Sequence, residues 1–232
     1  APQYQAGRRG NHAAHPAWEG DRGVFTGLVQ AKGRIAAIST APTGSRLVVE
    51  APWDQRPDPG DSICVSGCCL TLAEPASHGD GVVRMAFDVV HESLAKTTLG
   101  RLEVGSGVNL ETSCTPTTLL GGHIVQGHVE GVGEFERVQT GDDWRIIIKP
   151  PSELMPCITP KGSITIDGVS LTVAEVDVNA GTFGVALIPT TLEATTLCDA
   201  KAGERCNLET DILARTVIHY AKHYAGGHAA AD

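Results

Sequence analysis

The sequence SICVSGCCLT at residues 62–71 reappears as SITIDGVSLT at residues 163–172. Three further pairs keep the same order along the chain: TGLVQ at 26 with QGHVE at 126, LAKTTL at 94 with LEATTL at 192, and NLET at 109 with NLET at 207. Each pair is separated by roughly 100 residues, which is too long for a solenoid unit and long enough for a domain with its own core. The chain is therefore two copies of one fold.

Short alternating runs predict what that fold is. GVVRMAFDV at residues 81–89 and SITID at residues 163–167 alternate apolar and polar side chains, as half-buried strands do. About six such strands in each repeat favour a small closed barrel, because closure removes exposed edges. Residues 211–224 have the spacing of an amphipathic helix. We expect an all-β fold of two tandem homologous six-stranded, Greek-key-like β-barrels plus a C-terminal α-helix that is free to make an oligomer contact.

The expected boundaries are a disordered leader at residues 1–23, an N-terminal barrel at 24–120, a C-terminal barrel at 121–210, and a helix with a tail at 211–232. The leader is rich in Ala, Gly, Arg, His and Pro and lacks the apolar region of a secretory signal. It is either a transit-peptide remnant or a cloning remnant. We expect a cytoplasmic protein, or a plastid one if the leader is a transit-peptide remnant.

Composition narrows the class of function. A net charge of -9, without a clustered Lys/Arg run, argues against nucleic-acid binding. No apolar stretch approaches the roughly 20 residues that span a bilayer, so no membrane partner is expected. The seven cysteines are odd in number and contain no C-x-x-C pair, which argues against a zinc site or a disulfide framework and for a reducing compartment.

Four motifs resemble those of the riboflavin synthases. They are VFTGLVQ at residues 24–30, GCCLT at 67–71, GGHIVQGHVEG at 121–131 and KGSITIDGVSLTV at 161–173, in the order and spacing of that family. The resemblance implies a homotrimer, a transferase without cofactor or metal, and one 6,7-dimethyl-8-ribityllumazine in each barrel. It implies a site between the N-terminal barrel of one subunit and the C-terminal barrel of its neighbour. A four-carbon transfer there gives riboflavin and 5-amino-6-(D-ribitylamino)uracil. Association with lumazine synthase stays open.

This chemistry does not need an obvious acid–base dyad. The lumazine supplies its own electrophile, C7, and its own carbon acid, the C7 methyl group, so the protein mainly orients two copies. Fixing two reactants in attack geometry can supply roughly 7–11 kcal/mol, whereas a positioned acid or base typically adds about 10²–10⁴-fold in rate. We expect single polar substitutions to slow the reaction and loss of subunit contacts to abolish it.

Each candidate catalytic residue has a structural alternative. His128 could move the methyl proton, or it could be a histidine hydrogen-bonded in the barrel wall. Cys69, at the position of Ser170 in the repeat, could assist addition at C7 or be a buried structural thiol, while Cys68 should point to the opposite face. Lys161 could neutralise charge on the ring or be a solvated strand-end lysine. The candidate catalytic set, carried by the resemblance, is His128, Cys69, Ser62, Thr172, Lys161 and Asp211, the last of which could equally cap the final helix.

The resemblance also implies a set of substrate-binding positions. Glycines at residues 27 and 127 permit close approach of the backbone to the ring, and residues 88–93 and 188–193 include polar groups that could hold ribityl hydroxyls. His123 belongs either to the site or to a tight turn between the barrels. The expected substrate-binding residues are Phe25, Thr26, Gly27, Leu28, Val29, Cys69, Leu70, Thr71, Asp88, Val89, Val90, His91, Glu92, Ser93, Gly127, His128, Val129, Lys161, Ser170, Leu171, Thr172, Ile188, Pro189, Thr190, Thr191, Leu192 and Glu193.

Two other functions compete. A non-catalytic lumazine or flavin carrier of the same fold would bind without turnover, but the Gly-Gly-His-x-x-x-Gly-His segment and the Ser-Leu-Thr triplet of the second repeat favour the enzyme. A flavin-dependent reductase would need a nucleotide-binding βαβ unit with a glycine-rich loop, and the second repeat occupies that part of the chain.

Overall fold

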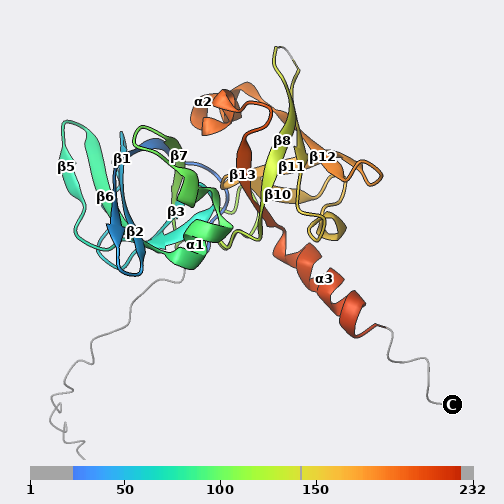
Figure 1. Ribbon diagram of the computed structural model, residues 1–232, viewed down its shortest axis with the longest axis horizontal. Helices are drawn as coiled ribbons and strands as arrows, with labels where there is room; N and C mark the ends of the chain where they lie inside the picture. Colours follow the sequence, from blue (N-terminus) through green and yellow to red (C-terminus); the bar gives the residue numbers. More distant parts are fainter. Residues whose placement is uncertain (1–22, 142, 226–232) are drawn as a thin grey trace, which may run out of the picture.

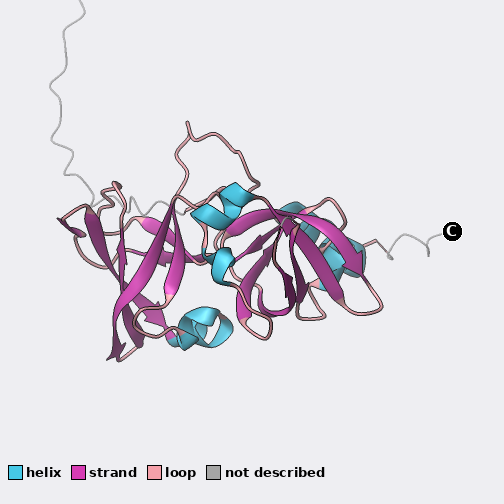
Figure 2. Ribbon diagram, turned by 90° about the horizontal axis from the view of Figure 1, so that it is seen from above, coloured by secondary structure: helices cyan, strands magenta, loops and turns pink. Residues whose placement is uncertain are grey.

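The computed structural model describes residues 23–141 and 143–225. It contains two β-structures joined in tandem and a C-terminal helix (Figure 1). Figure 2 shows the strands as two separate groups with short helical segments between them. The leader predicted at residues 1–23 lies outside the described residues except for Gly23, and so does the end of the tail, residues 226–232.

The first barrel is built from seven strand segments: β1 (Ala31–Ala41), β2 (Gly44–Ala51), β3 (Ser62–Val65), β4 (Cys68–Thr71), β5 (Ser77–Gly79), β6 (Val82–Val90) and β7 (Gly107–Thr112). Their order is β4-β3-β7-β1-β2-β6-β5. A bridge between Leu72 and Phe87 joins β4 to β6 and brings the ends of this sheet together. Helix α1 (His91–Lys96) and the 3-10 turn η1 (Thr98–Arg101) follow β6.

The second barrel repeats this arrangement and closes completely. Its strands are β8 (Gly131–Gln139), β9 (Trp144–Lys149), β10 (Ser163–Ile166), β11 (Val169–Asp177), β12 (Thr182–Leu187) and β13 (Arg205–Thr210), in the closed order β10-β11-β12-β9-β8-β13. Because β9 pairs with β12 rather than with β10, the connection is a Greek key. The single strand β11 occupies the place of β4 and β5, which explains the extra segment of the first barrel. The predicted all-β class with two repeats is confirmed.

Three short helical segments belong to the second repeat: the 3-10 turn η2 (Met155–Cys157), helix α2 (Pro189–Ala194) and the 3-10 turn η3 (Thr196–Asp199). Each barrel has its own apolar core. Ile35, Val49 and Phe87 are among the buried residues of the first, and Phe135, Ile148 and Phe183 among those of the second. The two repeats therefore bury separate cores, as the period of roughly 100 residues predicts.

The segment before each barrel crosses to the other barrel. Residues 25–29, here called the first crossing segment, precede β1, yet Val29 packs against the core of the second barrel. Residues 125–129, the second crossing segment, precede β8, yet Val129 packs against the core of the first barrel. The segments meet at Phe25 and Val125, whose backbones exchange hydrogen bonds of 2.7 and 3.0 Å. Each barrel is thus completed by residues of the other repeat.

Two equivalent asparagines also fasten the barrels together. The amide nitrogen Nδ2 of Asn109 donates to the Asp167 carbonyl at 2.9 Å, and that of Asn207 donates to the Ser66 carbonyl at 2.8 Å. Their Oδ1 atoms accept from the backbone amides of the opposite repeat, Asn109 from Thr196 and Asn207 from Thr98. The contacts are reciprocal, so the chain has an approximate internal twofold relation at this interface.

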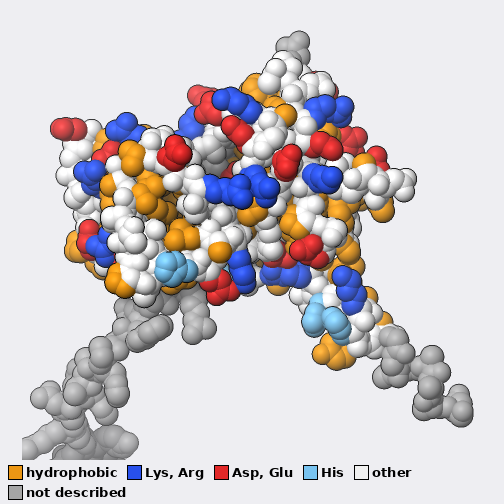
Figure 3. Space-filling model, in the orientation of Figure 1, with side chains coloured by type: hydrophobic (Ala, Val, Ile, Leu, Met, Phe, Trp, Pro, Cys, Tyr) orange, Lys and Arg blue, Asp and Glu red, His pale blue; other side chains and the backbone are white. Residues whose placement is uncertain are grey.

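Helix α3 (Ile212–His223) begins at Asp211, whose carboxylate accepts from the Leu213 amide at 2.9 Å. The helix runs away from the second barrel (Figure 1), and hydrophobic side chains are visible on its surface (Figure 3). Leu213, Val217 and Tyr220 recur at helical spacing and are 62% to 67% exposed. This exposed apolar face is a candidate contact for another subunit. In the described part of the chain no helix has the length and apolar character needed to cross a membrane.

Candidate functional site

The alternation of β4 and β11 directs the predicted polar side chains outward. On β4, Cys68 and Leu70 belong to the apolar core, whereas Cys69 is half-buried and Thr71 is exposed. This confirms that Cys68 and Cys69 point to opposite faces. On β11, Val169 and Leu171 belong to the second core, so Ser170 and Thr172 take the outer positions. The candidate site is therefore a surface outside each barrel, beside a crossing segment.

At the first barrel this surface combines residues of both repeats. The Cys69 amide donates a hydrogen bond of 2.8 Å to the carbonyl of Gly127, and the next residue, His128, is exposed. Gly127 has a φ of 71°, and a Cβ atom there would lie 2.7 Å from Cβ of Cys69. Only glycine allows this approach. Ser62, paired with Thr71 across β3 and β4, donates a hydrogen bond to the Cys69 thiol.

The surroundings of Cys69 favour the protonated form of its thiol. Burial raises its pKa, and the hydrogen bond from Ser62 opposes that rise. A thiol with a raised pKa is a weak nucleophile at neutral pH, since the thiolate is the reactive form. The geometry therefore suits a thiol that donates a hydrogen bond to a ligand better than one that attacks it.

The second barrel has an equivalent surface with different side chains. The Ser170 amide donates a 2.8 Å hydrogen bond to the carbonyl of Gly27, which has a φ of 75°. Leu28, the residue after Gly27, is 47% exposed and occupies the position that His128 has at the first barrel. A leucine in place of an imidazole makes the two surfaces chemically unequal.

His123 joins this second surface. Its Nδ1 atom lies 2.8 Å from the Ser170 hydroxyl, and its backbone amide donates to the carbonyl of Thr26. Nε2 is buried and has no hydrogen-bond partner among the described residues. Burial lowers the pKa of the imidazole, against the opposing charge of Asp211. The imidazole of His123 thus contacts the side chain of Ser170, a predicted substrate-binding residue, and membership of His123 in the site stays a prediction.

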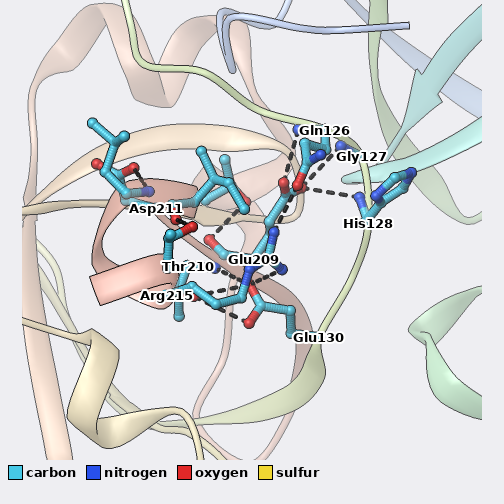
Figure 4. Close-up of polar contacts among 12 residues, drawn as sticks. Gln126, Gly127, His128, Glu130, Glu209, Thr210, Asp211 and Arg215 are labelled. Atoms are coloured by element: carbon cyan, nitrogen blue, oxygen red, sulfur yellow. Dashed lines mark hydrogen bonds and ion pairs between the residues drawn. The ribbon is translucent and has the colours of Figure 1, made fainter. Parts of the chain in front are cut away.

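Two buried glutamates hold the crossing segments, and the sequence analysis missed both. Glu111 on β7 accepts from the Thr26 amide and hydroxyl, each at 2.7 Å, and from the Gly27 amide at 3.0 Å. Glu209 on β13 accepts from three successive amides, those of Gln126, Gly127 and His128, at 2.7 to 3.1 Å (Figure 4). The sequence NLET, which occurs in both repeats, could have indicated these residues. A glutamate within a buried strand needs hydrogen-bond partners for its carboxylate.

The same burial perturbs both carboxyl groups. Desolvation raises the pKa of Glu111, and the hydrogen bonds from Thr26 and Gly27 oppose the rise. Desolvation raises the pKa of Glu209 to about 7, against the hydrogen bonds from the three amides and the charge of Arg215. The hold on the second crossing segment therefore depends on a carboxyl group that titrates near neutrality.

Comparison with known proteins gives the family. A family model described as the lumazine binding domain matches the chain twice, over residues 26–113 and 126–211. The chain belongs to the lumazine-binding domain family. Riboflavin synthase of Mycobacterium bovis is 39% identical over 197 residues, which cover 84% of this chain and 96% of that protein. Riboflavin synthase of Escherichia coli is 40% identical over 200 residues, 84% of this chain and 90% of that protein. These relatives confirm the expected enzyme of the transferase type.

A solved structure shows the same fold with a ligand. LumP complexed with 6,7-dimethyl-8-(1'-D-ribityl) lumazine aligns with a TM-score of 0.68 at 28% identity and covers 80% of this chain and 98% of that one. LumP complexed with flavin mononucleotide aligns with a TM-score of 0.63. Each alignment covers 80% of this chain and therefore includes residues of both repeats.

The predicted catalytic residues of this lumazine-binding chain divide into two sets. His128, Cys69 and Ser62 meet at the first barrel. Thr172 lies on β11 of the second barrel, and Lys161 is beside it, since the Lys161 amide donates to the carbonyl of Val173 at 2.8 Å. Asp211 interacts electrostatically with His123 and caps α3, which confirms the predicted helix cap, while its role at the active site stays a prediction.

The polar rim of the first barrel is already paired within the chain. Both carboxylate oxygens of Asp88 accept from Arg46 at 2.8 Å, and these hydrogen bonds lower the pKa of Asp88. Glu92 pairs with Lys96 one turn later on α1, at 2.6 Å. Ser93 is half-buried, and Val90 and His91 are exposed. A ligand at this rim would meet a fixed Asp88 carboxylate rather than a freely rotating one.

Several predicted substrate-binding residues direct their side chains away from the outer surface. Phe25 is fully buried between the barrels with Cys64 and Val125. Val89, Leu70 and Leu171 belong to the barrel cores. Only the backbone of these residues is available to a ligand. In the second repeat, Leu192 packs against the core, Thr191 is half-buried, and the exposed positions are Ile188, Pro189, Thr190 and Glu193.

Proposed function

We propose that this protein is a riboflavin synthase. It converts two molecules of 6,7-dimethyl-8-ribityllumazine into riboflavin and 5-amino-6-(D-ribitylamino)uracil by transfer of a four-carbon unit. The observation that carries the proposal is the pair of equivalent but chemically unequal surfaces, one with Cys69 and His128 and one with Ser170 and Leu28. A reaction between two identical molecules in different roles, donor and acceptor, requires two such surfaces.

The division of the predicted catalytic residues supports a site shared between subunits. Within one chain, His128 and Cys69 lie at the first barrel, whereas Lys161 and Thr172 lie at the second. A site between the first barrel of one subunit and the second barrel of its neighbour unites both sets. The exposed apolar face of α3 offers the contact for a homotrimer that creates this arrangement.

In this site the protein contributes mainly orientation. Two lumazines held face to face react through their own C7 methyl and C7 centre, and no resident cofactor is required. His128 moves the methyl proton, Cys69 donates a hydrogen bond to the ligand while Ser62 holds the Cys69 thiol, and Lys161 stabilises negative charge that develops on the ring. Cys64, Cys68 and Cys69 are free thiols on adjacent strands, as is typical of a reducing compartment. We place the enzyme in the cytoplasm, or in a plastid if the leader is a transit-peptide remnant.

The second candidate is a lumazine or flavin carrier, and the LumP complexes favour it as far as fold is concerned. The two functions separate in one assay. The protein is incubated with 6,7-dimethyl-8-ribityllumazine alone, and riboflavin fluorescence is followed together with the consumption of the lumazine. The synthase yields one riboflavin for each two lumazines consumed. A stable complex without any riboflavin would establish the carrier and overturn the proposal.

A further inference from the structure

Helix α3 is attached directly to the second crossing segment. Arg215, in the first turns of α3, donates from Nη2 to Oε1 of Gln126 at 2.6 Å, and its Nη1 lies 3.1 Å from the carboxylate of Glu130 (Figure 4). The side chains of Arg215 and Glu130 are only 28% and 14% exposed. Pairs that are partly removed from water are stronger and less screened by salt than surface pairs. Arg215 thus contacts Gln126, within the second crossing segment, and Glu130, which directly follows it, on either side of His128 in the sequence.

Strand β13 also holds this segment and the residue after it. Glu209 binds the amides of residues 126–128, and the amide and hydroxyl of Thr210 donate to Glu130 at 2.7 and 2.9 Å. The positive charge of Arg215 also favours the ionised form of Glu209. Loss of Arg215 therefore removes the contacts with Gln126 and Glu130. It also disfavours the ionised form of Glu209, the carboxylate that accepts a hydrogen bond from the His128 amide.

The first crossing segment provides a natural comparison. Gln30 stands where Glu130 stands in the second repeat, and it accepts from the Thr112 amide and hydroxyl at 3.2 Å. Glu111 holds Thr26 and Gly27 as Glu209 holds its own partners. Strand β7, however, is followed by the connection to the second repeat, whereas β13 is followed by α3. The arginine clamp is thus an addition to the segment that carries His128.

We propose that Arg215 is a positioning residue that makes the placement of His128 depend on helix α3. This inference extends the proposed function, because it assigns to the subunit-contact helix a second task, the ordering of the histidine segment. Coverage of α3 by a neighbouring subunit restricts the helix and, through Arg215, restricts residues 126–128. Assembly and the readiness of the first-barrel surface are then linked.

The test compares Arg215→Met, Arg215→Lys and the control Lys222→Met in the full chain. Lys222 lies two turns later on the same side of α3, so its substitution removes the same charge without touching Gln126 or Glu130. Amide hydrogen exchange of Gln126, Gly127 and His128 should accelerate about tenfold in Arg215→Met, the effect of losing one charge-assisted hydrogen bond. The amides of Thr26 and Gly27, held by Glu111, should keep their rates and serve as an internal reference.

Kinetics and assembly complete the test. With 6,7-dimethyl-8-ribityllumazine, Arg215→Met should lower kcat about tenfold with little change in KM, and Arg215→Lys should recover part of it because it keeps the ion pair with Glu130. Sedimentation should show the wild-type assembly for all three variants. Unchanged exchange at residues 126–128, or equal acceleration at Thr26 and Gly27, would overturn the inference. If the wild type makes no riboflavin, the proposed function fails while the exchange result still decides the role of Arg215.

Discussion

The backbone amide of Cys69 donates a hydrogen bond of 2.8 Å to the carbonyl of Gly127, although the two residues belong to different repeats. The equivalent hydrogen bond, also of 2.8 Å, runs from the amide of Ser170 in the second repeat to the carbonyl of Gly27 in the first. Each outer surface is therefore composite, with a strand from one repeat and a crossing segment from the other. Neither surface is complete without residues of the other repeat.

Gly127 should be far less tolerant of substitution than glycines with a similar backbone in open turns. Gly127→Ala places a Cβ atom 2.7 Å from that of Cys69 at a φ of 71°. Gly181→Ala has a φ of 68° with nothing within 4 Å, so it carries the backbone strain alone. We expect a loss of about 1 kcal/mol in unfolding free energy for Gly181→Ala and about 2–4 kcal/mol for Gly127→Ala. Denaturant unfolding measures both, and equal losses would refute the close approach.

Glu209 should make stability depend on pH in a defined direction. Its pKa in the folded protein is raised to about 7 from an ordinary value of 4.5, so the folded state holds the proton more tightly than the unfolded state. The stabilisation is complete below pH 4.5 and is lost as the pH rises through about 7. Relative to Glu209→Gln, the wild type should lose up to about 3 kcal/mol of unfolding free energy across that window.

Among the described residues, the charged and titratable groups facing Glu209 are Arg215 on α3, the thiol of Cys64 on β3 and the thiols of Cys68 and Cys69 on β4. None of the three thiols ionises in this window, because burial raises their pKa values above 9.0. Denaturant unfolding at several pH values should therefore show different slopes for the wild type and Glu209→Gln. Parallel slopes would mean that Glu209 has an ordinary pKa in the folded protein.

His128 should affect turnover more than binding. If it moves the C7 methyl proton, His128→Gln should lower kcat by about 10²–10⁴-fold and leave the KM for the lumazine nearly unchanged. His78 on β5 is exposed and remote in sequence from both crossing segments, so His78→Gln serves as the control and should keep full activity. Steady-state kinetics on both variants decide the matter. A normal kcat for His128→Gln would contradict a proton-transfer role for the imidazole.

The apolar face of α3 should control assembly and activity together. Val217 lies in the middle of this face and is 65% exposed, so Val217→Glu places a charge there. Burying this charge against another subunit costs several kcal/mol. We expect a smaller assembly by sedimentation and loss of riboflavin formation. His219→Glu adds the same charge outside the face that contains Leu213, Val217 and Tyr220 and should preserve both. A monomeric Val217→Glu protein with normal turnover would contradict a site shared between subunits.

The sequence predicted what depends on local pattern and repetition. Alternation along GCCLT placed Cys68 and Cys69 on opposite faces of one strand, and the offset of the repeats aligned Ser170 with Cys69. The crossing of residues 25–29 to the other barrel could not be predicted, because the hydrophobic pattern does not show against which of the two cores Val29 packs. The partners of Glu111 and Glu209 were hidden for the same reason: each lies more than 80 residues away along the chain.

The most direct test of the exchanged segments is a crystal structure with 6,7-dimethyl-8-ribityllumazine bound at both barrels. The account predicts that, within one chain, the ligand beside Cys69 contacts His128 and the ligand beside Ser170 contacts Leu28. A chain in which the ligand beside Cys69 is contacted by Leu28 of that same chain, with His128 at Ser170, would contradict it.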